Sequence, residues 1–250
     1  MRYTLLLFIT LTFVSCSRKA NNNDLADRKE KIEEAEGSAP TQGQIDRKTK
    51  SIEYCKSKGI PTIENLPYTE DAKIRPKEDV IGRALALCYL GLKSEGAEQK
   101  HLDGFEKKYQ VAQYFTEAEK LYVNASTPTE QQTTDANWRY ESLHVLLWSL
   151  GYLDDLSFPN EMCNVGEDVK IIFRKTKDEF IAGAKLRSKE EILDQADLIY
   201  RIHWACVDSR IKNQDAPSGL NPSIVYERHY ALNWLIHYMD QDWDDVSTDT

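Results

Sequence analysis

The chain has 250 residues, of which 41% are hydrophobic and 29% are charged. This composition suits a soluble globular protein better than an integral membrane protein or a disordered chain. The formal net charge is −9, so the protein lacks the positive field that attracts nucleic acid, and we expect no nucleic-acid partner. The length predicts one globular domain with appendages.

The first 15 residues have the pattern of a signal peptide. Arg2 precedes an apolar run at residues 3–14 that is too short to span a bilayer as a mature helix. Residues 13–15, Phe-Val-Ser, precede Cys16, and this pattern resembles the lipobox that bacterial lipoprotein signal peptidase cuts. Cys16 is therefore predicted to become a lipidated first residue, whose several acyl chains, such as palmitate, give stable anchoring in a bilayer. The alternative is an ordinary cleaved signal peptide with a chance cysteine.

The residues after Cys16 predict a location and a tether. Ser17 in place of Asp resembles the outer-membrane sorting pattern of Gram-negative bacteria, so we expect a lipid-anchored protein of the cell envelope, on the outer membrane and facing the periplasm. Residues 16–40 carry few large apolar side chains and are predicted to be a flexible tether. At no more than about 3.5 Å per residue, this tether could hold the domain tens of ångströms from the membrane.

Four further cysteines occupy positions 55, 88, 163 and 206. An exported compartment permits disulfides. Cys88 and Cys206, however, lie inside helical apolar patterns, where a free cysteine behaves as a small hydrophobic residue. We therefore expect buried thiols.

Residues 41–250 show recurrent helix start signals and few strand patterns. In a capping box, a Ser or Thr and a Glu or Gln three residues later each bond the other's backbone amide. Four pairs have this spacing: Thr41 with Gln44, Thr127 with Glu130, Thr176 with Glu179, and Ser188 with Glu191. Helices are predicted at about 42–58, 77–93, 103–122, 128–152, 167–174, 177–186, 189–212 and 222–239. The predicted fold is a single all-α domain, an irregular multi-helix bundle, onto which the Trp243 segment docks.

Several long motifs occur in a fixed order along this domain. They are RALAL at 83–87, WRYESL at 138–143, LLW at 146–148, DLIYRIHW at 197–204, ERHYALNW at 227–234 and WDDVSTDT at 243–250. With these motifs the chain resembles the bacterial family of domain of unknown function 4272, from about Arg47 to the C-terminus. The family has no established activity, so the resemblance implies no catalytic residue. The signal peptide and tether are additions that many members lack.

Charged and imidazole side chains are concentrated in the three most apolar predicted helices. On the helix at 189–212, Asp197, Arg201, Trp204 and Asp208 follow an i, i+4, i+7, i+11 spacing and share one face. The candidate site residues are Glu141, Asp197, Arg201, His203, Glu227, Arg228 and His229, with Arg139, His144 and Asn233 in the same helices.

Two interpretations of this cluster remain open. In the first, the groups pair across a helix bundle and the indole N–H groups are satisfied by the acids. In the second, they line a cleft in which a Glu or Asp acts as a general base, an Arg holds an anionic group and His203 or His229 transfers a proton. The sequence matches no known catalytic arrangement, which favours the first interpretation.

A metal site is a weaker possibility. His203 and Cys206 are three residues apart on one helix, and His144 or His229 could add a ligand. A histidine in an apolar helix is more often a hydrogen-bonded core residue, so we expect no metal and no cofactor. The acidic segment at 240–245 lacks the glycine and the bidentate Glu that an EF-hand loop needs.

These observations lead to two functional hypotheses. The first is a non-enzymatic, lipid-anchored envelope module that binds a protein partner. The alternative is a hydrolase-like enzyme that uses the Glu/Asp, Arg and His cluster between core helices. The first predicts paired charges sealed from solvent, and the second predicts unpaired carboxylates that line an open pocket.

Overall fold

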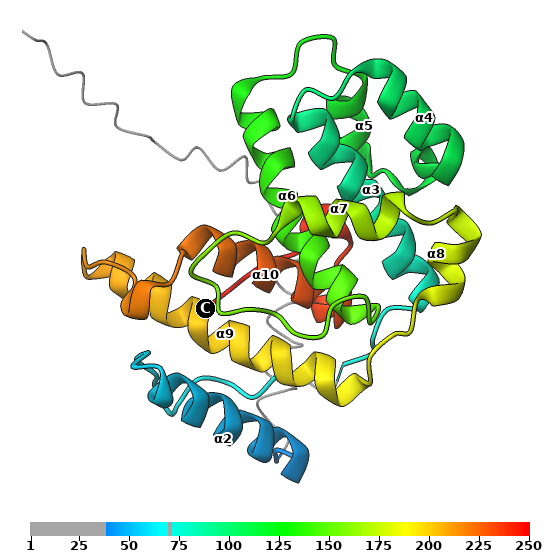
Figure 1. Ribbon diagram of the computed structural model, residues 1–250. Coiled ribbons are helices and arrows are strands. Elements are labelled where there is room, and N and C mark those ends of the chain that lie inside the picture. The colour runs from blue at the N-terminus through cyan, green and yellow to red at the C-terminus, as the bar shows by residue number, and fades with distance from the viewer. Residues whose placement is uncertain (1–38, 70–71) are drawn as a thin grey trace, which may run out of the picture. The chain divides into compact units, whose positions relative to one another are not determined.

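The computed structural model describes residues 39–69 and 72–250, and within them residues 40–250 form one compact unit (Figure 1). All regular secondary structure in these described residues is helical, which confirms the prediction of an all-α domain. The predicted signal peptide, and almost all of the predicted tether at 16–40, lie outside the described residues.

Nine α-helices and four short 3-10 helices make up the described part of the chain. The α-helices are α2 (Gln42–Ser57), α3 (Lys77–Ser94), α4 (Gln99–Tyr109), α5 (Glu117–Asn124), α6 (Glu130–Ser149), α7 (Val165–Phe173), α8 (Lys177–Gly183), α9 (Lys189–Ile211) and α10 (Pro222–Leu235). The 3-10 helices are η1 (Val111–Tyr114), η2 (Pro217–Gly219), η3 (Tyr238–Asp240) and η4 (Trp243–Asp245).

Three of the four predicted capping boxes are present, at the starts of α2, α8 and α9. The fourth prediction was wrong by two residues, because α6 begins after Thr129, whose hydroxyl accepts a hydrogen bond from the backbone amide of Gln132. This start places Glu130 in the first turn, where a carboxylate meets the positive end of the helix dipole.

The single helix predicted at 103–122 was also wrong. Gln110 adopts a left-handed conformation with φ 55° and ends α4, and η1 follows directly. A further capping box, formed by Thr116 and Glu119, then starts α5. The sequence held this second start signal, but the apolar pattern that runs across it obscured the break.

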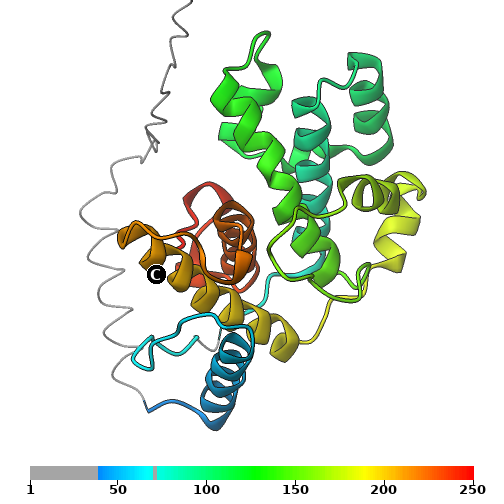
Figure 2. The same ribbon diagram turned by 60° about the vertical axis from the view of Figure 1, so that its left-hand side comes forward.

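The five longest helices pack in the order α3, α6, α10, α9 and α2, each against the next. Figures 1 and 2 show α9 with α10 along one side and α2 along the other. Helices α4 and α5 pack against α3, and α7 packs against α6. Because the inner helices are covered on several sides, most side chains in the second halves of α6 and α10 are buried. Across residues 39–69 and 72–250, no helix is both long and apolar enough to cross a membrane.

The C-terminal segment docks on α10, as predicted. Trp243 is 4% exposed, and its ring meets those of Tyr230 and Trp234 edge to face. The hydroxyl of Tyr230 donates a hydrogen bond to the carbonyl of Trp243. The four cysteines of the described residues are free and buried, which confirms the prediction for Cys88 and Cys206.

Gly91 is a buried residue within α3. A methyl group at this position would overlap the ring of Tyr140 on α6. We expect Gly91→Ala to lower the free energy of unfolding by about 1–3 kcal/mol through overpacking. Gly104→Ala on α4, where a methyl group meets nothing within 4 Å, should instead raise it by about 0.5–1 kcal/mol. Urea unfolding of both variants tests this, and equal effects would contradict it.

Candidate functional site

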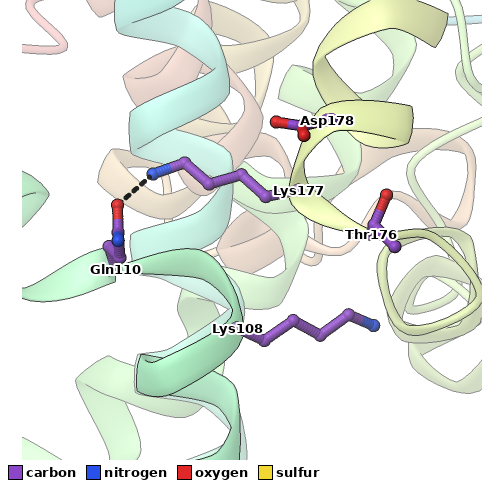
Figure 3. A pocket seen from close by; sticks show the side chains of 5 residues that line it. All are labelled: Lys108, Gln110, Thr176, Lys177 and Asp178. Carbon is purple, nitrogen blue, oxygen red and sulfur yellow. Dashed lines mark hydrogen bonds between the residues drawn. The ribbon is translucent and has the colours of Figure 1, made fainter.

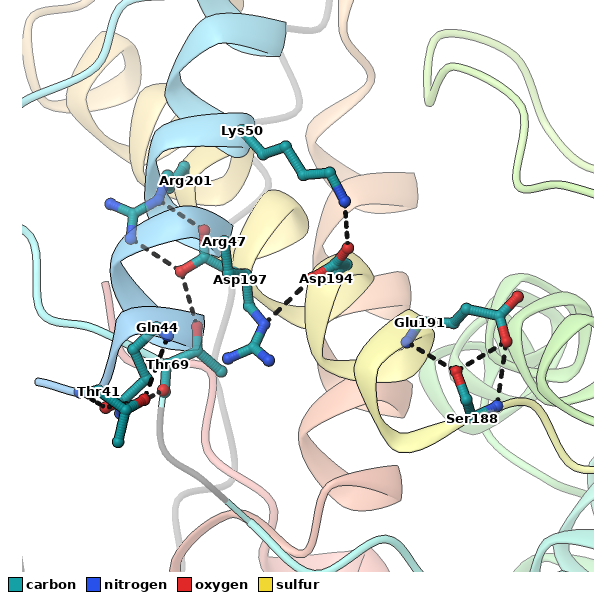
Figure 4. A network of polar contacts seen from close by, with 10 residues as sticks. All are labelled: Thr41, Gln44, Arg47, Lys50, Thr69, Ser188, Glu191, Asp194, Asp197 and Arg201. Carbon is teal, nitrogen blue, oxygen red and sulfur yellow. Dashed lines mark hydrogen bonds and ion pairs between the residues drawn. The ribbon is translucent and has the colours of Figure 1, made fainter.

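Asp197 and Arg201, two candidate residues of α9, form a buried ion pair that also binds the segment between α2 and α3 (Figure 4). Asp197 and Arg201 are both fully buried, and the guanidinium Nε and Nη2 donate to the two carboxylate oxygens at 2.9 and 2.8 Å. The hydroxyl of Thr69 donates to Asp197 at 2.9 Å, and Arg201 also donates to the carbonyl of Pro67 at 3.2 Å. These bonds fasten the segment between α2 and α3 to α9.

Two salt bridges to Asp194 join α9 to α2 as well. Arg47 and Lys50 of α2 both bond Asp194 of α9, at 3.2 and 2.7 Å. Figure 4 shows Asp194 beside Asp197 on α9, with dashed lines to Lys50 and Arg47 of α2. The capping boxes of α2 and α9 lie at the edge of the same network, so most of its polar groups serve helix starts or helix contacts.

The candidate residues of α6 and α10 form two further pairs across the contact of these helices. Glu141 is fully buried and accepts from Arg228 Nε at 3.1 Å and from the backbone amide of Cys163 at 2.5 Å. Glu227 accepts from Arg139 at 3.0 Å and from the Ser142 hydroxyl at 2.8 Å. Each carboxylate therefore has a cationic partner and a second donor.

The two candidate histidines bond each other. His203 Nδ1 and His229 Nδ1 are 2.8 Å apart in a buried contact between α9 and α10, so one ring donates and the other accepts. Burial, helped by Arg210, lowers the pKa of His203 to about 4. Burial and the neighbouring His203 hold the pKa of His229 well below its usual value. Both rings are therefore neutral at pH 7, and within the described residues no hydrogen bond joins either ring to a candidate acid.

The acids take arginines rather than indoles as partners, which corrects one sequence-based expectation. Asp197, Glu141 and Glu227 are each bonded by a guanidinium. The indoles instead meet guanidinium groups with their faces: Arg75 lies over Trp234 and Arg139 over Trp243, at 4.6 and 5.6 Å from the ring centroids. Asp208, the last member of the predicted stripe on α9, pairs with exposed Lys212 and stays outside the buried network.

Two guanidinium nitrogens of these ion pairs, Arg201 Nη1 and Arg228 Nη2, are buried without a hydrogen-bond partner in the part of the chain that the structure describes. Arg228 is 2% exposed. Its Nη1 donates to the carbonyl of Ser157 at 2.5 Å. Beside it lies a hollow of about 30 Å³ with mostly apolar walls from α2, α9, α10 and the 156–159 segment, which include Tyr54, Phe158 and Leu198.

Another hollow lies between the end of α4 and the start of α8 (Figure 3). It is open and polar, and Lys108 and Lys177 extend along it. Lys177 donates to the Gln110 side chain at 3.1 Å and Lys108 to the carbonyl of Phe173 at 2.9 Å. Thr176 is occupied as the cap of α8. None of the predicted site residues lines this hollow.

A separate cluster, which the sequence did not predict, lies between α6 and the start of α7. His144, Cys163 and Asp168 place one potential ligand atom each within 4.8 Å of one another. His144 Nδ1 and Asp168 Oδ2 are 2.8 Å apart. Burial, Glu141 and Asp168 together raise the pKa of the Cys163 thiol well above its usual value. His203 and Cys206, the pair weighed as metal ligands from the sequence, belong to no comparable group within residues 39–69 and 72–250.

The comparison with protein families identifies the domain that carries these residues. The family model described as domain of unknown function DUF4272 matches residues 47–246. The chain belongs to the DUF4272 family. No curated protein and no solved structure matches it. The match confirms the resemblance noted from the sequence motifs, and it brings no activity to this DUF4272 domain.

The DUF4272 domain gathers its predicted site residues into separate pairs rather than one cleft. The pairs are Asp197 with Arg201, Glu141 with Arg228, Glu227 with Arg139, and His203 with His229. All of these residues except Arg139 are less than 9% exposed. A general base needs a carboxylate or imidazole within reach of a substrate. Arg228, whose Nη2 has no partner among the described residues, is the candidate residue that lines the hollow beside α10.

Proposed function

We propose that this protein is a non-enzymatic, lipid-anchored module of the bacterial cell envelope that binds a protein partner through the hollow beside Arg228. The observation that supports the proposal is a buried guanidinium N–H without a partner in the described chain, next to apolar walls. An unsatisfied buried donor costs about 1–3 kcal/mol. A partner that supplies an oxygen acceptor recovers this cost, so the site discriminates strongly for such an acceptor.

The size and lining of the hollow define the chemistry of the occupant. A volume of about 30 Å³ accommodates a single small polar group. The rim residues Tyr54, Phe158 and Leu198 offer apolar surface of the kind that surrounds an anchor at a protein interface. The expected ligand is therefore a partner segment that places one carbonyl or carboxylate oxygen on Arg228 and an apolar side chain on the rim.

The buried ion pairs support a binding module over an enzyme. Glu141 and Asp197 are each used by an arginine and by a second donor, so freeing either as a base would leave a buried arginine without its counter-charge. A buried charge that has lost its partner destabilises the fold by several kcal/mol. Arg228 Nη2 has no partner to lose, so an acceptor that bonds it leaves the ion pair of Arg228 Nε with Glu141 in place.

Affinity capture with the full-length, membrane-anchored chain tests this proposal. Gln195→Arg places a long charged side chain on the rim, and we expect it to reduce the captured partner at least about tenfold, because it covers the hollow. Gln113→Arg makes the same chemical change on η1, away from the hollow, and should leave capture unchanged. Equal capture by both variants, both folded by urea unfolding, would exclude the hollow as the binding site.

The lipid anchor has a test of its own. Wild-type protein should incorporate labelled palmitate and sediment with membranes, because several acyl chains on Cys16 give stable anchoring. Cys16→Ala should take up no label and appear in the soluble fraction. Cys55→Ala, a cysteine inside the domain, serves as the control and should retain both properties. Palmitate uptake by Cys16→Ala would contradict the predicted anchor.

A further inference from the structure

The side chains of His144, Cys163 and Asp168 come from three different places in the fold. His144 lies in the last turns of α6, Cys163 lies just before α7, and Asp168 lies in the first turn of α7. Asn164 caps α7 through its side chain, which fixes the turn that carries both Cys163 and Asp168. The three residues are 9%, 8% and 2% exposed, so the cluster lies just below the surface.

We propose that His144, Cys163 and Asp168 form a binding site for a Zn²⁺ ion. Thiolate sulfur, imidazole nitrogen and carboxylate oxygen are the three donor types that zinc takes from proteins. A cluster that holds one of each differs from the salt bridges found elsewhere in this domain, because its thiol has no cationic partner. With three protein ligands, the fourth position of a tetrahedral site belongs to water.

The distances of the cluster fit this ion after small side-chain movements, in which the sulfur moves closer and the 2.8 Å contact of His144 Nδ1 with Asp168 Oδ2 lengthens. Zinc bonds of about 2.0–2.3 Å in a tetrahedron place the ligand atoms about 3.2–3.8 Å from one another. The three ligand atoms already lie within 4.8 Å of one another. His144 and Asp168, at 2.8 Å, share a hydrogen bond, and a zinc ion would bond both atoms in place of the shared proton. Small rotations of side chains bring the sulfur and the other two atoms to zinc distances.

The charges around the cluster also fit a dication. A zinc ion with a Cys163 thiolate, a neutral His144 and an Asp168 carboxylate is neutral overall. Glu141, which accepts the Cys163 backbone amide at 2.5 Å, is already compensated by Arg228, so it adds no net charge. Its hydrogen bond to the Cys163 amide positions the loop that carries this cysteine, in the way that residues bonded to metal ligands commonly orient them. A neutral site of this kind avoids the cost of an unpaired buried charge.

Zinc at this position would fasten α7 and the loop before it to α6. The loop from Leu150 to Asn164 has no regular helix and also carries Ser157, whose carbonyl holds Arg228. A metal that binds only the folded state raises stability in proportion to the logarithm of its concentration over its dissociation constant. The site would thus stabilise the same loop that forms one wall of the hollow proposed above, although the zinc proposal does not depend on that hollow.

The test uses the full-length chain in detergent under a reductant that does not bind metals. Co²⁺ replaces zinc in such sites, and a thiolate ligand gives a near-ultraviolet charge-transfer band. We expect one Co²⁺ per chain with this band, displaced by Zn²⁺. Cys163→Ser should abolish the band and weaken zinc binding at least about tenfold. Cys206→Ser, which removes an equally buried thiol of α9, should leave both unchanged.

A second readout protects the test against misfolded variants. Zn²⁺ should raise the unfolding temperature of the wild-type chain and of Cys206→Ser, but not that of Cys163→Ser. Asp168→Asn, which retains an oxygen for bonding but loses the charge, should show a weakened intermediate response. Wild-type protein without the thiolate band, or with zinc binding equal to that of Cys163→Ser, would overturn the proposal.

Discussion

Arg201→Met is expected to lower the free energy of unfolding by about 3–5 kcal/mol, because it leaves the fully buried Asp197 without its cation. The same substitution removes the hydrogen bond to the carbonyl of Pro67, so the segment between α2 and α3 should loosen. Urea unfolding followed by circular dichroism measures the loss, and hydrogen exchange should show reduced protection in α2.

The double variant Asp197→Leu with Arg201→Met provides the control for this experiment. Replacing a buried ion pair by apolar residues of similar volume is often neutral or stabilising, so most of the loss should be recovered. Arg187→Met removes the guanidinium of a partly exposed pair with Glu191 and should cost far less. A loss of less than about 1 kcal/mol for Arg201→Met would contradict the buried-pair interpretation.

Stability should also fall as the pH drops from about 6.5 to about 4. An unfolded histidine takes up its proton near pH 6.5, whereas His203 in the fold, buried and close to Arg210, does so at about 4. Between these values the unfolded state binds more protons, so the free energy of unfolding decreases as the pH falls. The contribution of His203 is complete above about pH 6.5, amounts to about 3 kcal/mol, and is lost at about pH 4. His229 shifts in the same direction and adds to the loss.

Variants separate this effect from the titration of carboxylates over the same range. His203→Asn removes one of the two titrating rings while keeping a polar partner for His229, so the unfolding free energy should vary less steeply between pH 6.5 and 4. His101→Gln alters an exposed histidine of α4 and should leave the slope of the wild type. Identical slopes for His203→Asn and the wild type would show that the histidine pair does not control acid stability.

The sequence predicted those parts of the fold that depend on neighbouring residues. Capping boxes operate over three residues, so the starts of α2, α8 and α9 could be placed from the sequence. Where two such boxes overlap, as around Thr127 and Thr129, the local pattern fits both, and tertiary packing selects one. The left-handed residue Gln110 carries no side-chain signal comparable to glycine, so the break after α4 was missed.

The candidate site was predicted as a set of residues, but its pairing was not. Helical spacing placed Asp197 and Arg201 on one face, and they do pair. Contacts between helices, such as Glu141 with Arg228, depend on how α6 and α10 cross, and one sequence holds no direct record of that angle. The same reason hid the cluster of His144, Cys163 and Asp168, whose members become neighbours only when α7 packs on α6.

The central claim is that the buried acid and arginine pairs belong to the core and that recognition takes place at the hollow. Affinity capture by the folded double variant Asp197→Leu with Arg201→Met tests this claim most directly. Our account predicts that this variant enriches the same partner as the wild type, at a similar level, because the hollow is intact. A folded double variant that no longer captures this partner would contradict the account and assign the pair to the functional site.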